Sequence, residues 1–422
     1  VAREYRGTWQ KMVYASAGAQ LLAVCIASTR GTLLALLCAA FIVAVYLAWK
    51  NNGRTQMYAR GAIAVAAILA VLFFIFRAQL AHAPIEPVRR IASISLSDGT
   101  VSSRLFLWSN VGKEALKAPL FGYGAEHIEA LFNRVYDPEQ IVEQWFDRSH
   151  NAYLDYFVQY GVLGLALYSA LILAALWSAW ALLRARDHYG GFVFLALLVA
   201  ALQNMFVFDT ALSFWLVLAM WAGILARGTS PARVLLVPKI PKEVSYGIAI
   251  IIAALVIPVS ILPMRANLLL AKAYVYHVAD VPQASKYLEK GLSLQTYADL
   301  EYGYQLYSMY ANQQVSMLSG EPRLAAYQFA RDVLEKNSHR FPYDGRTLVY
   351  LAHVLDLAPP EAALDEVRLR QVLDSAIEIS PRRLQPWYLK ANISLKAGDA
   401  ATTPTDKVRF YREAITLLEQ YA

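Results

Sequence analysis

Charged residues are scarce in this chain, which excludes an ordinary soluble protein. Only 17% of the 422 residues are Asp, Glu, Lys or Arg, and 57% are hydrophobic, whereas soluble domains carry about 25% charged residues. The apolar excess also excludes intrinsic disorder, because disordered chains lack the apolar residues that build a core. The composition is that of a membrane protein.

Cysteine is nearly absent, and no leader opens the chain. Cys25 and Cys38 both fall inside apolar runs, which predicts neither a disulfide framework nor a cysteine metal site. The first residue is Val1, and no signal peptide follows it. We therefore expect the sequence to begin inside a longer protein, with further membrane spans before the first one seen here.

The apolar residues gather in seven runs with few charges. Each run is close to the roughly 17–25 residues that a membrane-spanning helix needs. The runs cover residues 12–29, 31–49, 61–77, 154–182, 191–208, 211–226 and 244–263. The sequence thus predicts an all-α, polytopic membrane protein with about seven spans.

The basic residues predict the orientation of these spans. Lys and Arg concentrate in four connecting segments, 1–11, 50–60, 183–190 and 227–243. Cytoplasmic loops of membrane proteins carry such an excess, so the N-terminus is predicted to be inside. The long loop 78–153 and everything after residue 264 are then predicted to be outside. The net charge of +7 is explained by this pattern and does not indicate nucleic acid as a partner.

The composition changes near residue 264, which predicts two domains: a membrane domain at 1–263, including the loop 78–153, and an α-helical domain at 264–422. Amphipathic helices are predicted in the second domain at 284–294, 326–341, 369–380 and 408–418. Similar segments follow Pro342 and Pro381, an offset of about 39 residues that favours helix-pair repeats resembling tetratricopeptide units. A non-repetitive helical bundle is the alternative. Either arrangement offers a surface for a protein partner.

The outer loop 78–153 is where we expect chemistry, because loops longer than about 12–15 residues are usually functional or disordered. It contains a glycine-rich turn at 119–124 and ends at His150, at the mouth of the next span. Histidine titrates near neutral pH and can take a proton from a hydroxyl group. The alternative is that His150 only anchors the helix at the membrane interface.

Two arginines on the same predicted side could bind an anion. Arg30 lies at an outer turn between two spans, and Arg104 lies on a predicted helix of the outer loop. A guanidinium can hold phosphate oxygens in a bidentate way that lysine cannot. The alternatives are that Arg30 reaches the lipid headgroups and that Arg104 is a solvated surface charge.

Three stretches together resemble the O-antigen ligase and polymerase superfamily over about residues 12–226. They are the turn Ser28–Gly31, the stretch Arg104–Gly124 with its Pro-Leu-Phe-Gly-Tyr-Gly turn, and Ser149–Leu154 followed by Gly161 and Gly164. Each motif is weak alone, whereas their order, spacing and membrane placement are fairly specific.

The resemblance implies a bacterial inner-membrane glycosyltransferase of the GT-C type that works at the periplasmic face, with the C-terminal domain in the periplasm. Such enzymes transfer a glycan from undecaprenyl diphosphate to a hydroxyl group, and the resemblance implies no requirement for a nucleotide sugar, another cofactor or a metal. By the resemblance His150 corresponds to the residue thought to activate the acceptor, and Arg30 and Arg104 to residues thought to hold the diphosphate. Arg148, Asn151 and Tyr153 are secondary candidates that would support them.

The identity of the acceptor stays open. Ligation to the lipid A core, in lipopolysaccharide or exopolysaccharide biosynthesis, is placed slightly ahead of polymerisation of the glycan. Transfer to a protein is less favoured, because the proline-rich aromatic stretch expected in such enzymes is missing. Outside the enzyme class, the alternative is a non-catalytic membrane scaffold for polysaccharide assembly. A transporter is disfavoured because few charged residues lie in the middle of a span.

Overall fold

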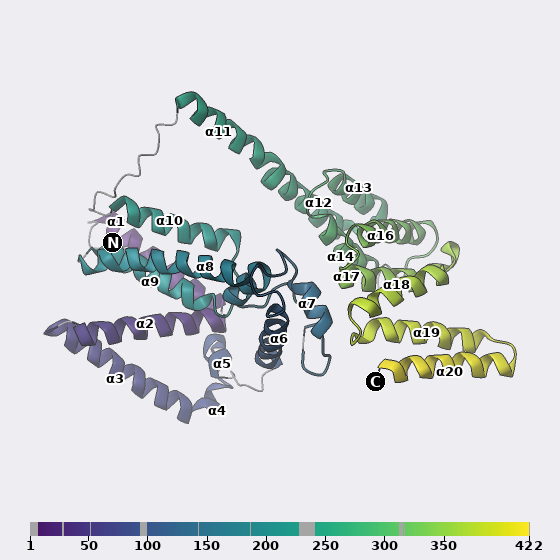
Figure 1. The fold of residues 1–422 in the computed structure, drawn as a ribbon, viewed down its shortest axis with the longest axis horizontal. Helices are drawn as coiled ribbons and strands as arrows, with labels where there is room; N and C mark the ends of the chain where they lie inside the picture. The colour runs from purple at the N-terminus through teal and green to yellow at the C-terminus, as the bar shows by residue number, and fades with distance from the viewer. Residues whose placement is uncertain are drawn as a thin grey trace. The chain divides into compact units, whose positions relative to one another are not determined.

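The computed structural model describes residues 7–27, 29–50, 52–92, 99–141, 143–185, 187–227, 241–311, 315 and 317–421. These residues form helices and turns and contain no β-strand (Figure 1), as the sequence predicts. The chain divides into two compact units. The N-terminal unit comprises Val1–Ile128 and Gln140–Arg233, and the C-terminal unit comprises Glu129–Glu139 and Val234–Ala422.

The longer apolar helices of the N-terminal unit overlap predicted spans. They are α1 (Thr8–Ala27), α2 (Arg30–Lys50), α3 (Arg54–Ile75), α4 (Arg77–Leu80), α5 (Glu86–Ala92), α6 (Gly99–Ala115), α8 (Ala152–Arg184), α9 (His188–Gln203) and α10 (Ala211–Arg227). Helix α7 (Ile128–Val135) begins in this unit and continues in the other. The described outer loop is thus built mainly of short helices.

Among the described residues, four helices are long and apolar enough to cross a membrane: Arg30–Lys50, Arg54–Ile75, Ala152–Arg184 and Glu243–Tyr276. Shorter apolar helices cover Tyr189–Gln203 and Ala211–Arg227. Leu37, Phe74 and Ile250 are 61%, 71% and 69% exposed, which would be unfavourable in water and is expected of side chains that face lipid. The chain is an all-α, polytopic membrane protein, and the total of seven spans stays a prediction.

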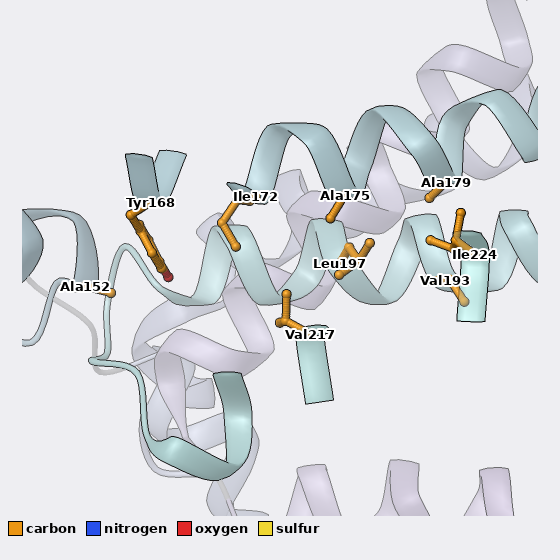
Figure 2. Packing of buried hydrophobic residues seen from close by; sticks show 9 residues of the cluster. All are labelled: Ala152, Tyr168, Ile172, Ala175, Ala179, Val193, Leu197, Val217 and Ile224. Atoms are coloured by element: carbon orange, nitrogen blue, oxygen red, sulfur yellow. The ribbon is translucent and has the colours of Figure 1, made fainter. Parts of the chain in front are cut away.

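Helices α8, α9 and α10 share a core of the N-terminal unit. On α8 the buried positions are Tyr168, Ile172, Ala175 and Ala179, a spacing of three and four residues that lines one helical face. Figure 2 shows this face against residues of α9 and α10, among them Leu197 and Val217. The small alanines allow close approach of the helices. The same core includes Ala152, the first residue of α8, which lies next to the predicted site.

The span predicted at 191–208 is shorter than expected. Helix α9 ends at Gln203, and residues 204–210 form an irregular connection to α10. The physical reason lies in Asn204, whose side chain donates to the hydroxyl of Tyr168 at 2.7 Å and to Asp209 at 3.0 Å. Its carbonyl accepts from the N–H of Ala152 at 2.8 Å. These contacts draw the chain away from the helical path.

The C-terminal unit begins with a long helical rod. It consists of α11 (Lys242–Val256), a π-helical turn (Ile257–Ile261) and α12 (Leu262–Tyr276). The π-helical turn contains Pro258, which has no N–H for the regular helical ladder. The domain boundary predicted at residues 263 and 264 falls inside this rod. The predicted boundary separates the membrane domain from the domain outside the bilayer. A division into compact units does not locate the bilayer, so this boundary stays a prediction.

The remaining helices follow the amphipathic pattern seen in the sequence. They are α13 (Val281–Leu292), α14 (Asp299–Tyr310), α16 (Glu321–Arg340), α17 (Gly345–Asp356), a short 3-10 turn (Pro360–Ala362), α18 (Glu366–Ile379), α19 (Leu384–Ala400) and α20 (Pro404–Tyr421). The four predicted amphipathic segments lie largely within α13, α16, α18 and α20. Gly345 and Leu384, the first residues of α17 and α19, preserve the predicted offset, whereas the likeness to tetratricopeptide units stays a prediction.

Candidate functional site

Three of the predicted site residues, Arg30, Arg104 and His150, lie near the α9–α10 segment, residues 204–210. Gly31 lies so close to it that an added Cβ would be 3.1 Å from the Cβ of Phe206, which places the first turn of α2, beginning at Arg30, against this segment. Arg104 on α6 donates to the carbonyl of Phe206 at 3.5 Å. The ring of His150 lies 5.8 Å from that of Phe208. Residues far apart in sequence therefore meet around one short connection. Ser28 of the predicted turn lies outside the described residues.

His150 has a strained backbone held by its neighbours. Its φ of +56° is in the left-handed region, which non-glycine residues rarely occupy and which costs about 1–3 kcal/mol. Ser149 on one side is completely buried. The carboxylate of Asp155 accepts from the N–H of Ser149 at 2.9 Å and from the Ser149 hydroxyl at 2.5 Å. The indole of Trp108 donates to the carbonyl of Ser149 at 2.6 Å.

Asn151 fixes the other side of His150. Its side-chain oxygen accepts from the N–H groups of Tyr153 and Leu154 at 3.1 and 3.2 Å and so caps the N-terminus of α8. The histidine is thus held between a buried serine and a helix cap. Such over-determined strain is found most often at functional sites.

The surroundings keep the imidazole of His150 uncharged near neutral pH. Burial, and then the positive charge of Arg104, lower its pKa below the ordinary value of 6.5, while Glu143 and Asp147 oppose the shift. The ring of Phe146, 5.8 Å away, contributes to the apolar surroundings. A neutral imidazole can accept a proton.

The glycine-rich turn at 119–124 and the break in α8 form one interlocked unit. Gly161 breaks the helix with φ +67° and ψ −165°. Two carbonyls before the break, those of Val158 and Gln159, accept from the N–H groups of Tyr123 and Gly124, both at 2.9 Å. The N–H of Val162, beyond the break, donates to the carbonyl of Pro119 at 2.7 Å. Two motifs that the sequence shows separately therefore complete each other's backbone hydrogen bonds.

Glycine is required at this interlock because the two backbones nearly touch. A Cβ on Gly161 would lie 2.2 Å from the carbonyl oxygen of Leu120. A Cβ on Gly122 would lie 2.6 Å from the backbone of residues 159–161. No other residue fits at either position without displacement of the turn.

The secondary candidates have structural contacts of their own. Arg148 forms an ion pair with Glu126 at 2.6 Å and reaches the side chain of Gln159 at 3.4 Å, which ties it to the interlock. Tyr153 donates to the carbonyl of Ala201 at 3.0 Å. Asn151 is the helix cap described above. Their roles in function stay predictions.

A polar network holds the α9–α10 segment against α8. The hydroxyl of Tyr168 donates to the carboxylate of Asp209, which also accepts from Ser213 at 3.3 Å. The ring of Tyr156 stacks on that of Tyr168 at 3.9 Å. This network anchors the segment on which the site residues converge.

Sequence reasoning missed Asp155, Phe206 and Phe208. Asp155 had a readable signal, since an acidic residue inside an apolar run marks a functional position by default. The two phenylalanines had none, because apolar residues at the end of an apolar run look like part of the span. Among the described residues, no group of three or more His, Cys, Asp or Glu side chains could hold a metal ion.

The sequence model of a family described as O-antigen ligase matches residues 15–169. No curated protein and no solved structure matches the chain significantly. The matched range includes Arg30, Arg104, His150 and both halves of the interlock, and it leaves the C-terminal helices outside.

Proposed function

Residues 15–169 form an O-antigen ligase domain, which places the chain in the O-antigen ligase and polymerase superfamily, and from this premise we propose that it transfers a glycan from undecaprenyl diphosphate to an acceptor hydroxyl. The reaction takes place at the periplasmic face of the bacterial inner membrane. Ligation to the lipid A core is the first candidate, and polymerisation of the glycan is the second.

The observation that carries this proposal is the pairing of a neutral histidine with an arginine at one segment. His150 and Arg104 interact electrostatically, and both contact residues 206–208. A base for the acceptor and a cation for the leaving group are the two groups that transfer from a diphosphate needs. Their common contact with one segment supports a single site.

In the proposed reaction the acceptor oxygen bonds to the anomeric carbon of the glycan. The bond from that carbon to the diphosphate oxygen breaks, and its electron pair leaves with the diphosphate. The hydroxyl proton passes to the neutral imidazole of His150. Arg104 and Arg30 stabilise the negative charge that develops on the leaving diphosphate.

The test compares His150→Ala with His82→Ala in a strain that lacks the chromosomal gene. His82 is an exposed histidine of the same outer loop and serves as the matched control. We expect loss of the glycan product with His150→Ala at a normal protein level, and normal product with His82→Ala. Normal product with both variants would contradict the proposal and favour a non-catalytic scaffold.

The same strains separate the possible acceptors. Loss of polysaccharide on the lipid A core indicates a ligase, and a change in chain length without that loss indicates a polymerase. Loss of glycan from proteins would indicate a protein oligosaccharyltransferase.

A further inference from the structure

One short piece of the outer loop belongs to the C-terminal unit. Residues 129–139 group with the C-terminal helices, although the chain before and after them belongs to the N-terminal unit. The chain thus enters the C-terminal unit from the loop, returns to the loop, and enters the unit again near Val234. We call residues 129–139 the clasp segment.

The centre of the contact is a buried arginine of the C-terminal helices. Arg383 precedes α19 and is completely buried. Its guanidinium donates to the side-chain oxygen of Asn133 at 2.9 Å and lies 4.1 Å from the centre of the Tyr136 ring. Both partners come from the clasp segment. A buried charge is costly unless it is paired, so the segment supplies interactions that this arginine requires.

Further contacts surround this centre. The hydroxyl of Ser380 donates to the carbonyl of Asn133 at 3.0 Å, and both residues are buried. Arg382 pairs with Asp137 at 3.3 Å, and Arg346 lies 3.8 Å from Glu129. The clasp segment supplies the acids and the C-terminal helices supply the bases, so the contact is complementary in charge as well as in hydrogen bonding.

The apolar side chains of the clasp segment are buried as well. Phe132 and Leu131 are 0% and 1% exposed, and the rings of Phe132 and Tyr136 pack edge to face at 5.7 Å. Arg134 on the same helix is exposed. The clasp segment therefore contributes buried aromatic side chains as well as hydrogen bonds to the C-terminal unit.

The clasp segment lies between predicted site residues in the chain. Arg104 and the glycine-rich turn precede it, and His150 follows it eleven residues after Glu139. Fixing the middle of a loop reduces the conformations open to both of its halves. We propose that the C-terminal helical domain is a positioning element for glycan transfer, which it serves by holding the clasp segment through Arg383, Asn133 and Tyr136. This inference rests on the proposed function.

The test makes the contact switchable by a disulfide. An added Cβ on Gly345 would lie 3.5 Å from the Cγ of Asn133, and a cysteine at 133 would have its sulfur near that Cγ. The pair Asn133→Cys and Gly345→Cys removes the hydrogen bond to Arg383 and leaves the arginine in place. Diamide closes the bridge and dithiothreitol opens it. The chain's own cysteines, Cys25 and Cys38, lie on α1 and α2. The single variants Asn133→Cys and Gly345→Cys serve as matched controls for the redox treatment.

Two readouts are compared in membrane vesicles of the native host that carry only the variant. The first is consumption of the undecaprenyl-diphosphate-linked glycan, and the second is trypsin cleavage after Arg134. With the bridge open we expect at least about ten-fold slower consumption, which corresponds to about 1.4 kcal/mol, together with faster cleavage. With the bridge closed, both should return toward the wild-type values.

Equal consumption in the open and closed states, once a thiol-labelling gel shows that the bridge has formed, would overturn the positioning role. A failure of the proposed function looks different. In that case the wild-type vesicles consume no glycan either, while trypsin cleavage after Arg134 still responds to the bridge.

Discussion

The interlock between the glycine-rich turn and the break in α8 makes a strong prediction for Gly161→Ala. The new Cβ would lie 2.2 Å from the carbonyl oxygen of Leu120, which real structures do not tolerate, so the turn must withdraw. Withdrawal breaks three backbone hydrogen bonds, those that join Tyr123 to Val158, Gly124 to Gln159 and Val162 to Pro119. The backbone angles of Gly161 are also nearly exclusive to glycine.

The magnitude follows from these two effects. Each lost backbone hydrogen bond costs about 1 kcal/mol, and a non-glycine residue with these backbone angles costs about 1–3 kcal/mol. We therefore expect Gly161→Ala to lower the free energy of unfolding by about 4 kcal/mol or more, which is at the diagnostic end for single substitutions. Transfer should be lost as well, because the turn lies between Arg104 and His150 in the chain.

The assay is thermal unfolding of the detergent-purified protein, followed by size-exclusion chromatography after heating. Gly61→Ala is the matched control, since Gly61 lies on α3 with nothing within 4 Å of an added Cβ. Alanine is a better helix former than glycine, so this control should be neutral or slightly stabilising. An unfolding temperature for Gly161→Ala equal to that of Gly61→Ala would refute the interlock.

Three further predictions concern the site and the topology. Transfer should fall as the pH falls through the pKa of His150, because the neutral imidazole is the active form, and this fall should lie below pH 6.5. In Arg104→Gln the fall should move to higher pH, because Arg104 lowers the pKa of His150. A fall at the same pH in this variant would exclude the coupling between Arg104 and His150. Arg30→Lys should slow transfer about ten-fold or more, because lysine keeps the charge but not the bidentate geometry; near-normal transfer would show that this geometry is irrelevant. A periplasm-reporting fusion after about residue 300 should be active and one near Arg233 inactive, and the reverse pattern would exclude the proposed orientation.

Much of the fold could be predicted because membrane spans and amphipathic helices are local patterns. Apolar runs of span length gave the main helices of the N-terminal unit, and the spacing of apolar residues gave the four helices in the C-terminal unit. The end of α9 could not be predicted in this way. Asn204 stops the helix through hydrogen bonds to Tyr168 and Asp209, and those partners are known only once the chain is folded.

The candidate site was partly readable for a similar reason. The residue types of Arg30, Arg104 and His150 carry chemistry that a sequence shows directly. Their common neighbour, the α9–α10 segment, is defined by tertiary contacts alone. The interlock was half predictable. Glycines at 122 and 161 indicate an unusual backbone, whereas the pairing of the glycine-rich turn with the break in α8 depends on hydrogen bonds between distant segments.

The clasp segment was not predicted at all. Residues 129–139 lie in the middle of a long loop, and their apolar positions Leu131, Phe132 and Tyr136 suit any buried helix. The partner of the segment, Arg383, is more than two hundred residues away in the chain. A lone arginine in a helical domain is usually a surface charge, and only its complete burial reveals the contact.

The most direct measurement of the central claim uses the purified protein in liposomes with undecaprenyl-diphosphate-linked glycan and the lipid A core as acceptor. With the wild-type chain we expect a glycan-bearing lipid A core and free undecaprenyl diphosphate to accumulate together, and with His150→Ala we expect neither. Equal formation of both products by the wild-type and His150→Ala proteins would contradict it, since the acceptor would then be activated by some other group.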